Sequence, residues 1–301
     1  MPINIKHFPL VSIIVNCYNG ETYLADAIKS VLFQSYKNFE IIFWDNQSKD
    51  KSASIYKSFK DKRLKYYYAK KHTSLYEARN LAVKKAKGKF ISFLDVDDLW
   101  IKNKLSLQIR KFNNTKVKLV YSNYYILNQF TSLKNIAYKK KLPEGIILEY
   151  LLKNYFIGIC TVVLKREIFS KYKKKFNKNY NIIGDFDLFI RLSVNFHFAS
   201  VQRPLSIYRI HNKSFSNNNY QMHINELKSW INSQKIFSKN SLFYIQQKIF
   251  YMEAILSIIN RKFVLSFKNI LKVLSIKKKI KLIMFLLIPH KILKVLKKNF
   301  S

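Results

Sequence analysis

Residues 90–98 read Phe90-Ile91-Ser92-Phe93-Leu94-Asp95-Val96-Asp97-Asp98, an apolar run typical of a buried strand that ends in three carboxylates. Only 17 of the 301 residues are Asp or Glu, against 55 Lys or Arg, so solubility gives this chain little reason to place three acids together. Carboxylates this close repel one another unless a cation lies among them. Other acids are also grouped, as Asp45 with Asp50 and as Asp185 with Asp187. We therefore interpret these acids as parts of one site.

Strand and helix patterns alternate along the first third of the chain. Ser74 and Glu77 fit a capping box, which independently marks a helix start. The alternation indicates an α/β fold with a mainly parallel, doubly wound sheet. Apolar runs predict strands over residues 10–15, 39–44, 64–68 and 90–94, and periodic segments predict helices over residues 21–33, 50–59 and 74–86.

Polar segments directly follow three of the predicted strands. Residues 16–20, 45–48 and 95–98 all lie at the carboxyl end of a strand. Ligands of a doubly wound sheet bind beyond these ends. We therefore expect the three loops to converge on one binding site.

The rest of the chain is less regular at first and then becomes helical. Strands are predicted over residues 119–125 and 161–164, a helix over residues 145–152, and an amphipathic helix that opens with two acids over residues 185–194. After His211 the pattern is helical. These patterns predict a domain of residues 1–215 and a basic, amphipathic helical region of residues 216–301.

The acidic turn has more than one possible interpretation. An EF-hand loop requires Gly at its sixth position and Glu at its twelfth, whereas Trp100 and Ser106 stand there, so an EF-hand is excluded. A haloacid-dehalogenase-type phosphatase would use Asp95 as its nucleophile. That motif normally follows the first strand, but here three strand and helix pairs precede it. The phosphatase and a purely structural helix cap remain alternatives.

Six short motifs occur in a characteristic order. They are Val11-Ser12-Ile13-Ile14-Val15-Asn16-Cys17-Tyr18-Asn19, Asp45-Asn46-Gln47-Ser48-Lys49-Asp50, Ala78-Arg79-Asn80, Gly88-Lys89-Phe90-Ile91-Ser92-Phe93-Leu94-Asp95-Val96-Asp97-Asp98, Gly184-Asp185-Phe186-Asp187-Leu188-Phe189-Ile190-Arg191-Leu192 and Tyr208-Arg209-Ile210-His211. Over about residues 9–215 this order resembles the family 2 glycosyltransferases of the GT-A fold. The resemblance implies an inverting, metal-dependent enzyme that transfers a hexosyl or N-acetylhexosaminyl group.

The resemblance also implies roles for residues at the nucleotide-sugar donor. Asp97 would hold Mn²⁺ or Mg²⁺ against the donor diphosphate, whose departure the cation stabilises. Asp95 would contact the ribose or complete the metal shell, and Asp45 would accept hydrogen bonds from the base. Arg79 would meet uracil or phosphate, with a surface or interhelical ion pair as the alternative. The same pocket would be lined by Tyr18, Asn19 and Glu21.

Asp185 is the general base that the resemblance implies. In an inverting displacement the acceptor hydroxyl attacks opposite the leaving diphosphate, so the base must lie away from the metal. The family usually has Glu before this Asp, whereas this chain has Gly184, so Asp187 remains an alternative base or a solvated acid on the helix face. The family also often has Gly just before its Ala-Arg-Asn, where this chain has His72-Thr73-Ser74. His211 would be a further metal ligand or would orient a loop.

The formal net charge of +38 favours anionic partners. Lys dominates the basic residues and is spread along the chain, so biased coding remains an alternative explanation for much of the charge. The expected partners are a UDP-sugar donor, a lipid-linked or surface-polysaccharide acceptor and an anionic membrane surface. Nucleic acid is not expected, and a non-enzymatic basic lipid- or nucleic-acid-binding protein is the rival class. The oligomeric state stays open.

The C-terminal region is both basic and apolar. Twelve of residues 261–301 are Lys or Arg, and the longest apolar run there, residues 282–289, is far short of the roughly 20 residues that span a bilayer. We expect this region to lie in a membrane interface, with packing on the catalytic domain or on a second subunit as the alternative. Cys17 and Cys160 are too few for a disulfide framework, and no signal peptide pattern opens the chain. A cytoplasmic protein, peripheral on the inner face of the cell membrane, is expected.

Overall fold

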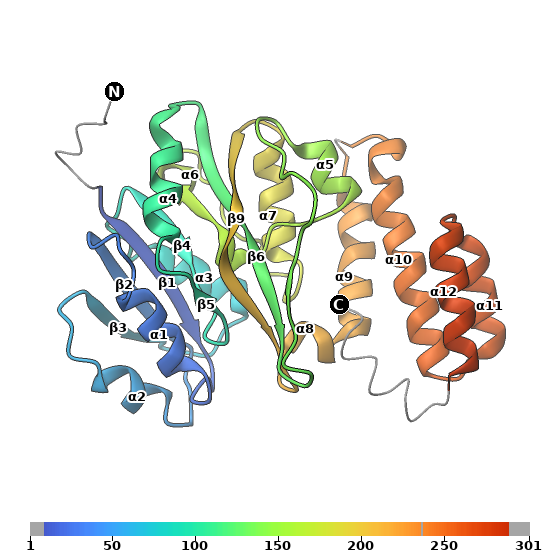
Figure 1. Cartoon of the computed structure of the whole chain (residues 1–301), viewed down its shortest axis with the longest axis horizontal. Helices are drawn as coiled ribbons and strands as arrows, with labels where there is room; N and C mark the ends of the chain where they lie inside the picture. Colours follow the sequence, from blue (N-terminus) through green and yellow to red (C-terminus); the bar gives the residue numbers. More distant parts are fainter. Residues whose placement is uncertain (1–8, 236, 289–301) are drawn as a thin grey trace. The chain divides into compact units, whose positions relative to one another are not determined.

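A computed structural model describes residues 9–235 and 237–288, which form two compact units (Figure 1). The first unit comprises the described residues up to Leu148 together with Phe156–Arg209. The second comprises Glu149–Tyr155 and the described residues from Ile210 onward. The division after Arg209 falls close to the boundary predicted between residues 215 and 216.

A nine-stranded sheet forms the centre of the first unit, with strand order β3-β2-β1-β4-β8-β6-β9-β5 and β7 paired to β6. The first four strands of this order are parallel, as predicted, while β8 pairs antiparallel with both β4 and β6. The expected α/β class is therefore confirmed, with an antiparallel extension. The strands are β1 Val11–Cys17, β2 Phe39–Asp45, β3 Leu64–Tyr68, β4 Phe90–Phe93, β5 Leu99–Trp100, β6 Val117–Asn128, β7 Lys134–Ile136, β8 Val163–Lys165 and β9 His197–Ile210.

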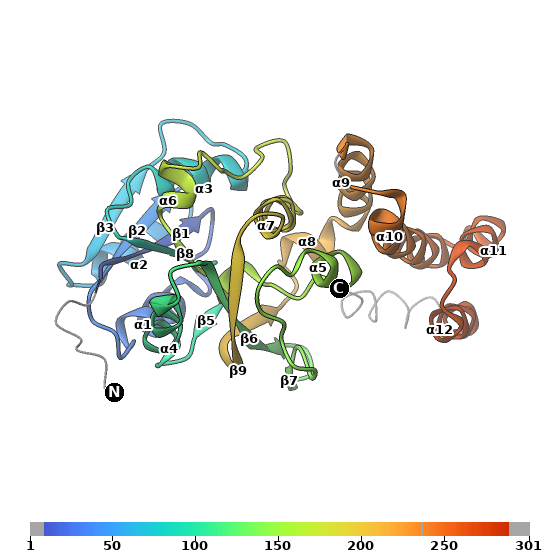
Figure 2. The same ribbon diagram turned by 90° about the horizontal axis from the view of Figure 1, so that it is seen from above.

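Helices cover both faces of the sheet, and Figure 2 shows α1 and α4 on one face and α3 and α6 on the other. Strands β1, β2 and β4 are buried along their whole length, which explains their nearly continuous apolar sequences. The helices that begin in this unit are α1 Leu24–Leu32, α2 Ser52–Ser58, α3 Leu75–Val83, α4 Lys104–Arg110, α5 Leu148–Lys153, α6 Glu167–Ser170 and α7 Gly184–Ser193.

Several predicted elements begin later than expected, and for two of them the structure shows the cause. The helix predicted from residue 145 starts at Leu148, because Gly145 adopts a φ of 91° and exchanges two backbone hydrogen bonds of 2.8 Å with Phe198. The strand predicted from Thr161 starts at Val163, because Ile159–Thr161 forms a 3₁₀ turn. Both differences come from contacts with distant segments or from local turn geometry that apolar patterning does not report.

The second unit is helical. Its helices are α8 Phe215–Asn218, α9 Tyr220–Ser233, α10 Lys239–Ile259, α11 Phe263–Lys272 and α12 Ile276–Leu287. Helix α10 ends in a Schellman motif: Lys262 N–H donates to Ser257 O, and Arg261 N–H donates to Ile258 O. Arg261 occupies the left-handed position of this motif with a φ of 56°, and the turn directs α11 back against α10.

One helical stretch among the described residues, Asn240–Ile259, has the length and mean hydropathy of a membrane span. Of the best window in this stretch, 44% is buried inside the protein. Its inward side chains include Ile249, Met252 and Ile255, which are buried. A core helix of a soluble protein has the same properties.

Lys104 of α4 is completely buried. Its Nζ lies 3.2 Å from Ser92 Oγ and 3.4 Å from Val162 O, and 4.1 Å from the centre of the Trp100 ring. No ion pair to a carboxylate is formed by Lys104 within the described ranges 9–235 and 237–288. Burial lowers the pKa of Lys104 from 10.5 to about 7.

We expect the Lys104→Met variant to be more stable than the wild type at pH 7. The unfolded chain keeps the Lys104 proton up to about pH 10 while the folded chain loses it near pH 7, so wild-type stability rises with pH between these values. At about 1.4 kcal/mol per pKa unit, the rise between pH 7 and pH 9 is about 2 kcal/mol, and the Met variant lacks it. Urea unfolding at both pH values measures it. The exposed Lys102→Met control should retain the rise, and an unchanged pH dependence in Lys104→Met would contradict the assignment.

Candidate functional site

Two loops at the carboxyl ends of β1 and β2 are joined by reciprocal hydrogen bonds. Asn19 and Glu21, predicted to line a nucleotide pocket, each donate a backbone N–H to the second loop and accept one in return. Asn19 adopts a φ of 53°, in the left-handed region where Asn is tolerated. Both side chains thus have a structural role. The bonds are Asn19 N–H to Ser48 Oγ (3.0 Å), Lys49 N–H to Asn19 Oδ1 (2.9 Å), Glu21 N–H to Asp50 Oδ2 (2.9 Å) and Lys51 N–H to Glu21 Oε2 (2.9 Å).

A third loop, after β3, is attached through Asn46. The Asn46 amide donates to Thr73 O at 2.8 Å and accepts from Thr73 N–H at 3.2 Å. His72 Nδ1 lies 2.9 Å from Asn46 O; because a carbonyl only accepts, Nδ1 carries the proton. The Tyr18 ring, 52% exposed, lies 4.4 Å from the His72 ring. In the sequence, His72 was noted only as a departure from the family motif. Its position after a predicted strand was the one feature that could have marked it as a residue of the site.

Asp45 lies at the predicted strand end and is completely buried. Its Oδ1 accepts the Ser48 N–H at 2.7 Å, and its Oδ2 accepts the Tyr66 hydroxyl at 2.7 Å. The carboxylate therefore supports the turn after β2. Its direct contact with a base stays a prediction.

A buried ion pair joins α3 to the end of β4. Arg79 Nη2 lies 2.5 Å from Asp95 Oδ1, and the Arg79 side chain is almost fully buried while Asp95 is partly exposed. Burial by itself lowers the pKa of the Arg79 guanidinium, but the Asp95 carboxylate raises it, and the net pKa lies above its usual value. Arg79 therefore forms the ion pair named as the alternative to a ligand contact, and it does so inside the protein.

The same helix also reaches the predicted base. The Tyr76 hydroxyl lies 2.8 Å from Ile182 O and 3.2 Å from Asp185 Oδ1, at the start of α7. A Cβ added at Gly184 would lie 2.5 Å from the Tyr76 ring, so no side chain fits there. The departure from the usual Glu at this position thus has a steric cause: Tyr76 occupies the space.

The environment of Asp185 raises its pKa. Burial raises the pKa of this carboxyl above its ordinary value, and the positive charge of Arg79 holds part of the rise back. Asp185 therefore binds its proton more tightly than an exposed Asp, which suits a group that must accept a proton.

Helix α3 further holds the segment that leads to α7. Asn80 Nδ2 donates to Phe176 O at 2.8 Å, and Asn80 Oδ1 accepts the Phe176 N–H at 3.0 Å. The Ser74 hydroxyl donates to Lys178 O at 3.0 Å and accepts the Glu77 N–H at 3.4 Å, so the predicted helix cap is confirmed. The Ala-Arg-Asn motif thus fixes two distant segments from one helix.

The three acids of the turn after β4 lie in different environments. Asp98 is buried; its Oδ1 accepts the Arg209 N–H at 3.1 Å, and it hydrogen-bonds the Cys160 thiol. Burial raises the pKa of Asp98 well above its usual range, and Asp97 and Asp95 raise it further. Asp95 and Asp97 remain partly exposed. Asp98 is therefore a structural acid, and the two others are the carboxylates available to a ligand.

Asp95 and Asp97 provide oxygen ligands of the kind that Mg²⁺ and Mn²⁺ prefer. Within the part of the chain that the structure describes, no cluster of three or more His, Cys, Asp or Glu residues is arranged around a metal position. Mg²⁺ is commonly bound by one or two carboxylates together with substrate phosphates and water. The residues present fit such a cation.

His211 belongs to the second unit and directly follows β9. Its Nδ1 accepts the Lys213 N–H at 3.1 Å, and its backbone N–H donates to Ser214 Oγ at 3.1 Å. A neutral ring that accepts at Nδ1 carries its proton on Nε2. These two hydrogen bonds hold the loop after β9, which is the alternative role predicted for His211. Metal ligation by His211 stays a prediction.

Asp187, the alternative base, is not a solvated acid. It is buried, and its Oδ2 accepts from Arg191 Nε at 3.0 Å and Nη2 at 2.7 Å. Arg191 lies one turn further along α7 and neutralises the charge of Asp187. Of the two acids, Asp185 is the one linked to Asp95, through Tyr76 and Arg79.

The chain is similar to known glycosyltransferases. The sequence model described as glycosyl transferase family 2 matches residues 12–186. The Escherichia coli UDP-Glc:alpha-D-GlcNAc-diphosphoundecaprenol beta-1,3-glucosyltransferase WfgD is 33% identical over 264 residues, which cover 86% of this chain and 97% of WfgD. WfaP of Escherichia coli, named for the same reaction, is 39% identical over 160 residues, 52% of this chain and 61% of WfaP.

Solved structures show the same fold. Staphylococcus aureus TarS 1–349 in complex with UDP has a TM-score of 0.60 at 14% identity, covering 97% of this chain and 92% of that one. The mannosyltransferase PcManGT of Pyrobaculum calidifontis, in complex with GDP-Man and Mn²⁺, has a TM-score of 0.58 at 14% identity, covering 98% and 88%. The predicted GT-A fold is confirmed. This protein belongs to glycosyl transferase family 2 and is a glycosyltransferase.

Proposed function

We propose that this enzyme transfers a glycosyl group, with inversion, from a UDP-sugar to a lipid-linked acceptor used to build a surface polysaccharide. The linked arrangement of Asp95, Arg79, Tyr76 and Asp185 carries the proposal, because it connects the donor end of the site with a proton acceptor far along the sequence. The printed names of WfgD and WfaP support a UDP-sugar and an undecaprenyl diphosphate acceptor.

The two rival functions account for fewer observations. A phosphatase would need Asp95 as a nucleophile, whereas Asp95 Oδ1 is held by Arg79. A non-enzymatic basic protein would have no use for Asp185 with a raised pKa next to a second acid. Membership of a glycosyltransferase family also disfavours both.

Asp97 and Asp95 are the proposed ligands of Mn²⁺ or Mg²⁺. When bound, the cation neutralises negative charge that develops on the leaving diphosphate. His211 would join them only through Nε2, after its ring proton moved to another position, so the proposal depends on the two carboxylates. Arg79 pairs with Asp95 and thereby orients this carboxylate at the proposed donor site.

The base of the nucleotide is proposed to lie against the exposed ring of Tyr18 and its neighbour His72. An aromatic ring stacks on a planar base regardless of the base's hydrogen-bonding pattern. Asn19, Glu21 and Asp45 hold the loops that carry this surface. Their contribution to donor binding is therefore largely positional.

Asp185 is proposed to accept the proton of the attacking hydroxyl. Its raised pKa increases its affinity for that proton, and the Tyr76 contact fixes its position. A base on α7, separate from the acidic turn, allows attack from the side opposite the diphosphate. This geometry favours inversion.

Apolar residues on α11 and α12 are proposed to contact a membrane. Val264 is 86% exposed and Leu287 82% exposed, while Leu282 and Phe285 pack inward. Lysines lie beside these apolar residues, at Lys268 and Lys272 in α11 and at Lys277, Lys278, Lys279 and Lys281 in α12. An amphipathic helix of this kind lies in the interface of an anionic bilayer. Four further lysines of the predicted tail, Lys291, Lys294, Lys297 and Lys298, lie outside the described residues.

The Asp97→Ala variant should lose Mn²⁺-dependent binding of UDP. Without this carboxylate the cation is held poorly, and the diphosphate charge stays uncompensated. Calorimetric titration with UDP, with and without Mn²⁺, measures the effect. Asp61→Ala removes an acid before β3, at the opposite end of the strand, and should bind like the wild type. An unchanged Mn²⁺-dependent affinity in Asp97→Ala would remove Asp97 from the metal site.

The Asp185→Asn variant should keep UDP affinity and lose about 10²- to 10⁴-fold in kcat, the usual contribution of a general base. Wild-type kcat should fall as pH falls through the raised pKa of Asp185, because only the ionised carboxylate accepts a proton. The matched Asp187→Asn variant breaks the pair with Arg191. It should lower Tm, and its loss of kcat should be smaller than that of Asp185→Asn. A larger kcat defect in Asp187→Asn would show that the wrong acid has been assigned.

Membrane contact is tested by replacing exposed apolar residues. The triple variant Val264→Ser, Phe267→Ser and Leu271→Ser should lose most cosedimentation with vesicles of phosphatidylcholine and phosphatidylglycerol at 0.5 M NaCl, since salt leaves only the apolar contribution. A control makes three equivalent changes on the first unit, Phe33→Ser, Leu133→Ser and Ile136→Ser. Equal cosedimentation of both variants would mean that α11 is not the contact.

A further inference from the structure

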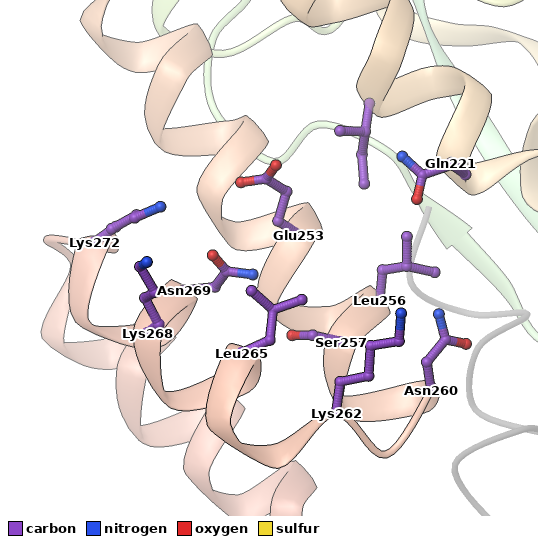
Figure 3. Close-up of a pocket in the computed structure, with 11 residues that line it drawn as sticks. Gln221, Glu253, Leu256, Ser257, Asn260, Lys262, Leu265, Lys268, Asn269 and Lys272 are labelled. Atoms are coloured by element: carbon purple, nitrogen blue, oxygen red, sulfur yellow. The ribbon is translucent and has the colours of Figure 1, made fainter.

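The second unit contains a cavity of about 290 Å³ between α9, α10 and α11 (Figure 3). It lies entirely within one unit, and none of the residues assigned to glycosyl transfer lines it. Its wall combines lysine side chains and amides with a few apolar side chains. The lining residues that bear on its ligand are Glu253, Leu256, Lys262, Leu265, Lys268, Asn269 and Lys272.

The Asn269 side chain indicates that the cavity binds a ligand. It is only 5% exposed, and Figure 3 shows its amide directed from α11 toward α10. Within residues 9–235 and 237–288, the Asn269 side chain forms no hydrogen bond to another residue, whereas its buried neighbour Ser257 donates to Ala254 O. The Asn269 amide lines the cavity and is not fully enclosed, so a bound molecule can supply a hydrogen-bond partner to it there.

The charges around the cavity determine what kind of molecule fits. Lys262, Lys268 and Lys272 contribute three positive charges. The one carboxylate, Glu253, is paired with Lys228 at 2.6 Å and is therefore neutralised. The cavity thus attracts an anion and repels a metal cation.

An anion with several acceptor oxygens and an apolar part suits this wall best. Phosphate oxygens accept hydrogen bonds from ammonium groups and from an amide N–H simultaneously. Leu256 and Leu265 provide apolar contact within the cavity. A phospholipid carries both chemical parts in one molecule.

We propose that this cavity binds the phosphate headgroup of an anionic phospholipid. The Asn269 amide and the ammonium groups of Lys268 and Lys272 hold the phosphate oxygens, and Lys262 closes the opposite side. Leu256 and Leu265, the apolar residues of the cavity wall used here, contact the acyl chains. The site would recognise one lipid molecule, in addition to the general attraction of a basic surface to a bilayer.

Titration of the full-length protein with dihexanoyl-phosphatidylglycerol, below its micelle-forming concentration, tests the site without a membrane surface. The Lys268→Gln, Lys272→Gln double variant should weaken Kd at least about tenfold, because two charge-assisted contacts are lost. The control double variant Lys277→Gln, Lys281→Gln removes the same charge from α12, outside the cavity, and should change Kd less than about twofold. Equal losses in the two variants would overturn the proposal, since only diffuse charge would then matter.

A substitution that leaves the lysines unchanged measures the contribution of the Asn269 amide to binding separately from that of the charges. Asn269→Leu keeps size and charge and should weaken Kd about fivefold, whereas Asn232→Leu on the exposed part of α9 should not. Unchanged Kd in a folded Asn269→Leu protein, verified by its melting temperature, would contradict the role of Asn269. Inorganic phosphate should bind at least about tenfold more weakly than the lipid; equal affinity would identify a free-phosphate site instead. None of these measurements uses turnover, so they succeed or fail independently of the proposed transfer reaction.

Discussion

The buried ion pair between Arg79 and Asp95 fixes α3 against the end of β4, and the arrangement of the functional edge depends on it. A guanidinium placed in the interior requires a partner, because an unpaired buried charge is strongly destabilising. Once α3 is fixed, Tyr76 contacts the start of α7 and Asn80 holds Phe176. This interaction therefore helps to fix where Asp95, a proposed metal ligand, and Asp185, the candidate base, lie.

Hydrogen bonds to backbone groups hold the other side of the site together. The loops after β1, β2 and β3 are joined by side chains such as Asn19 and Asn46, which accept backbone N–H groups that a loop would otherwise leave to water. This explains why polar residues that a family pattern assigns to ligand binding are also structural. Substituting them would disturb both functions, whereas Tyr18, with its exposed ring, is free of that double role.

The scarce acids of this chain are used in distinct ways. Asp98 is buried with a raised pKa and links the acidic turn to Arg209 and Cys160, and Asp187 is neutralised by Arg191. Asp95 and Asp97 remain partly exposed. In the second unit, lysines lie beside exposed apolar residues and around a cavity. Charge and apolar area together favour an anionic amphiphile over a simple ion.

The sequence by itself determined the α/β alternation, the helix cap at Ser74 and the position of Asp45 and Asp95 at strand ends, because these features depend on local periodicity and capping. The tertiary structure alone decided the antiparallel half of the sheet, the inward orientation of Asp98 and the neutralisation of Asp187. It also explained Gly184 through the Tyr76 ring. The physical reason is that each of these depends on residues far apart in the chain, or on which side of a helix faces the core. Local pattern does not specify which distant side chain fills a given space, and only packing decides it.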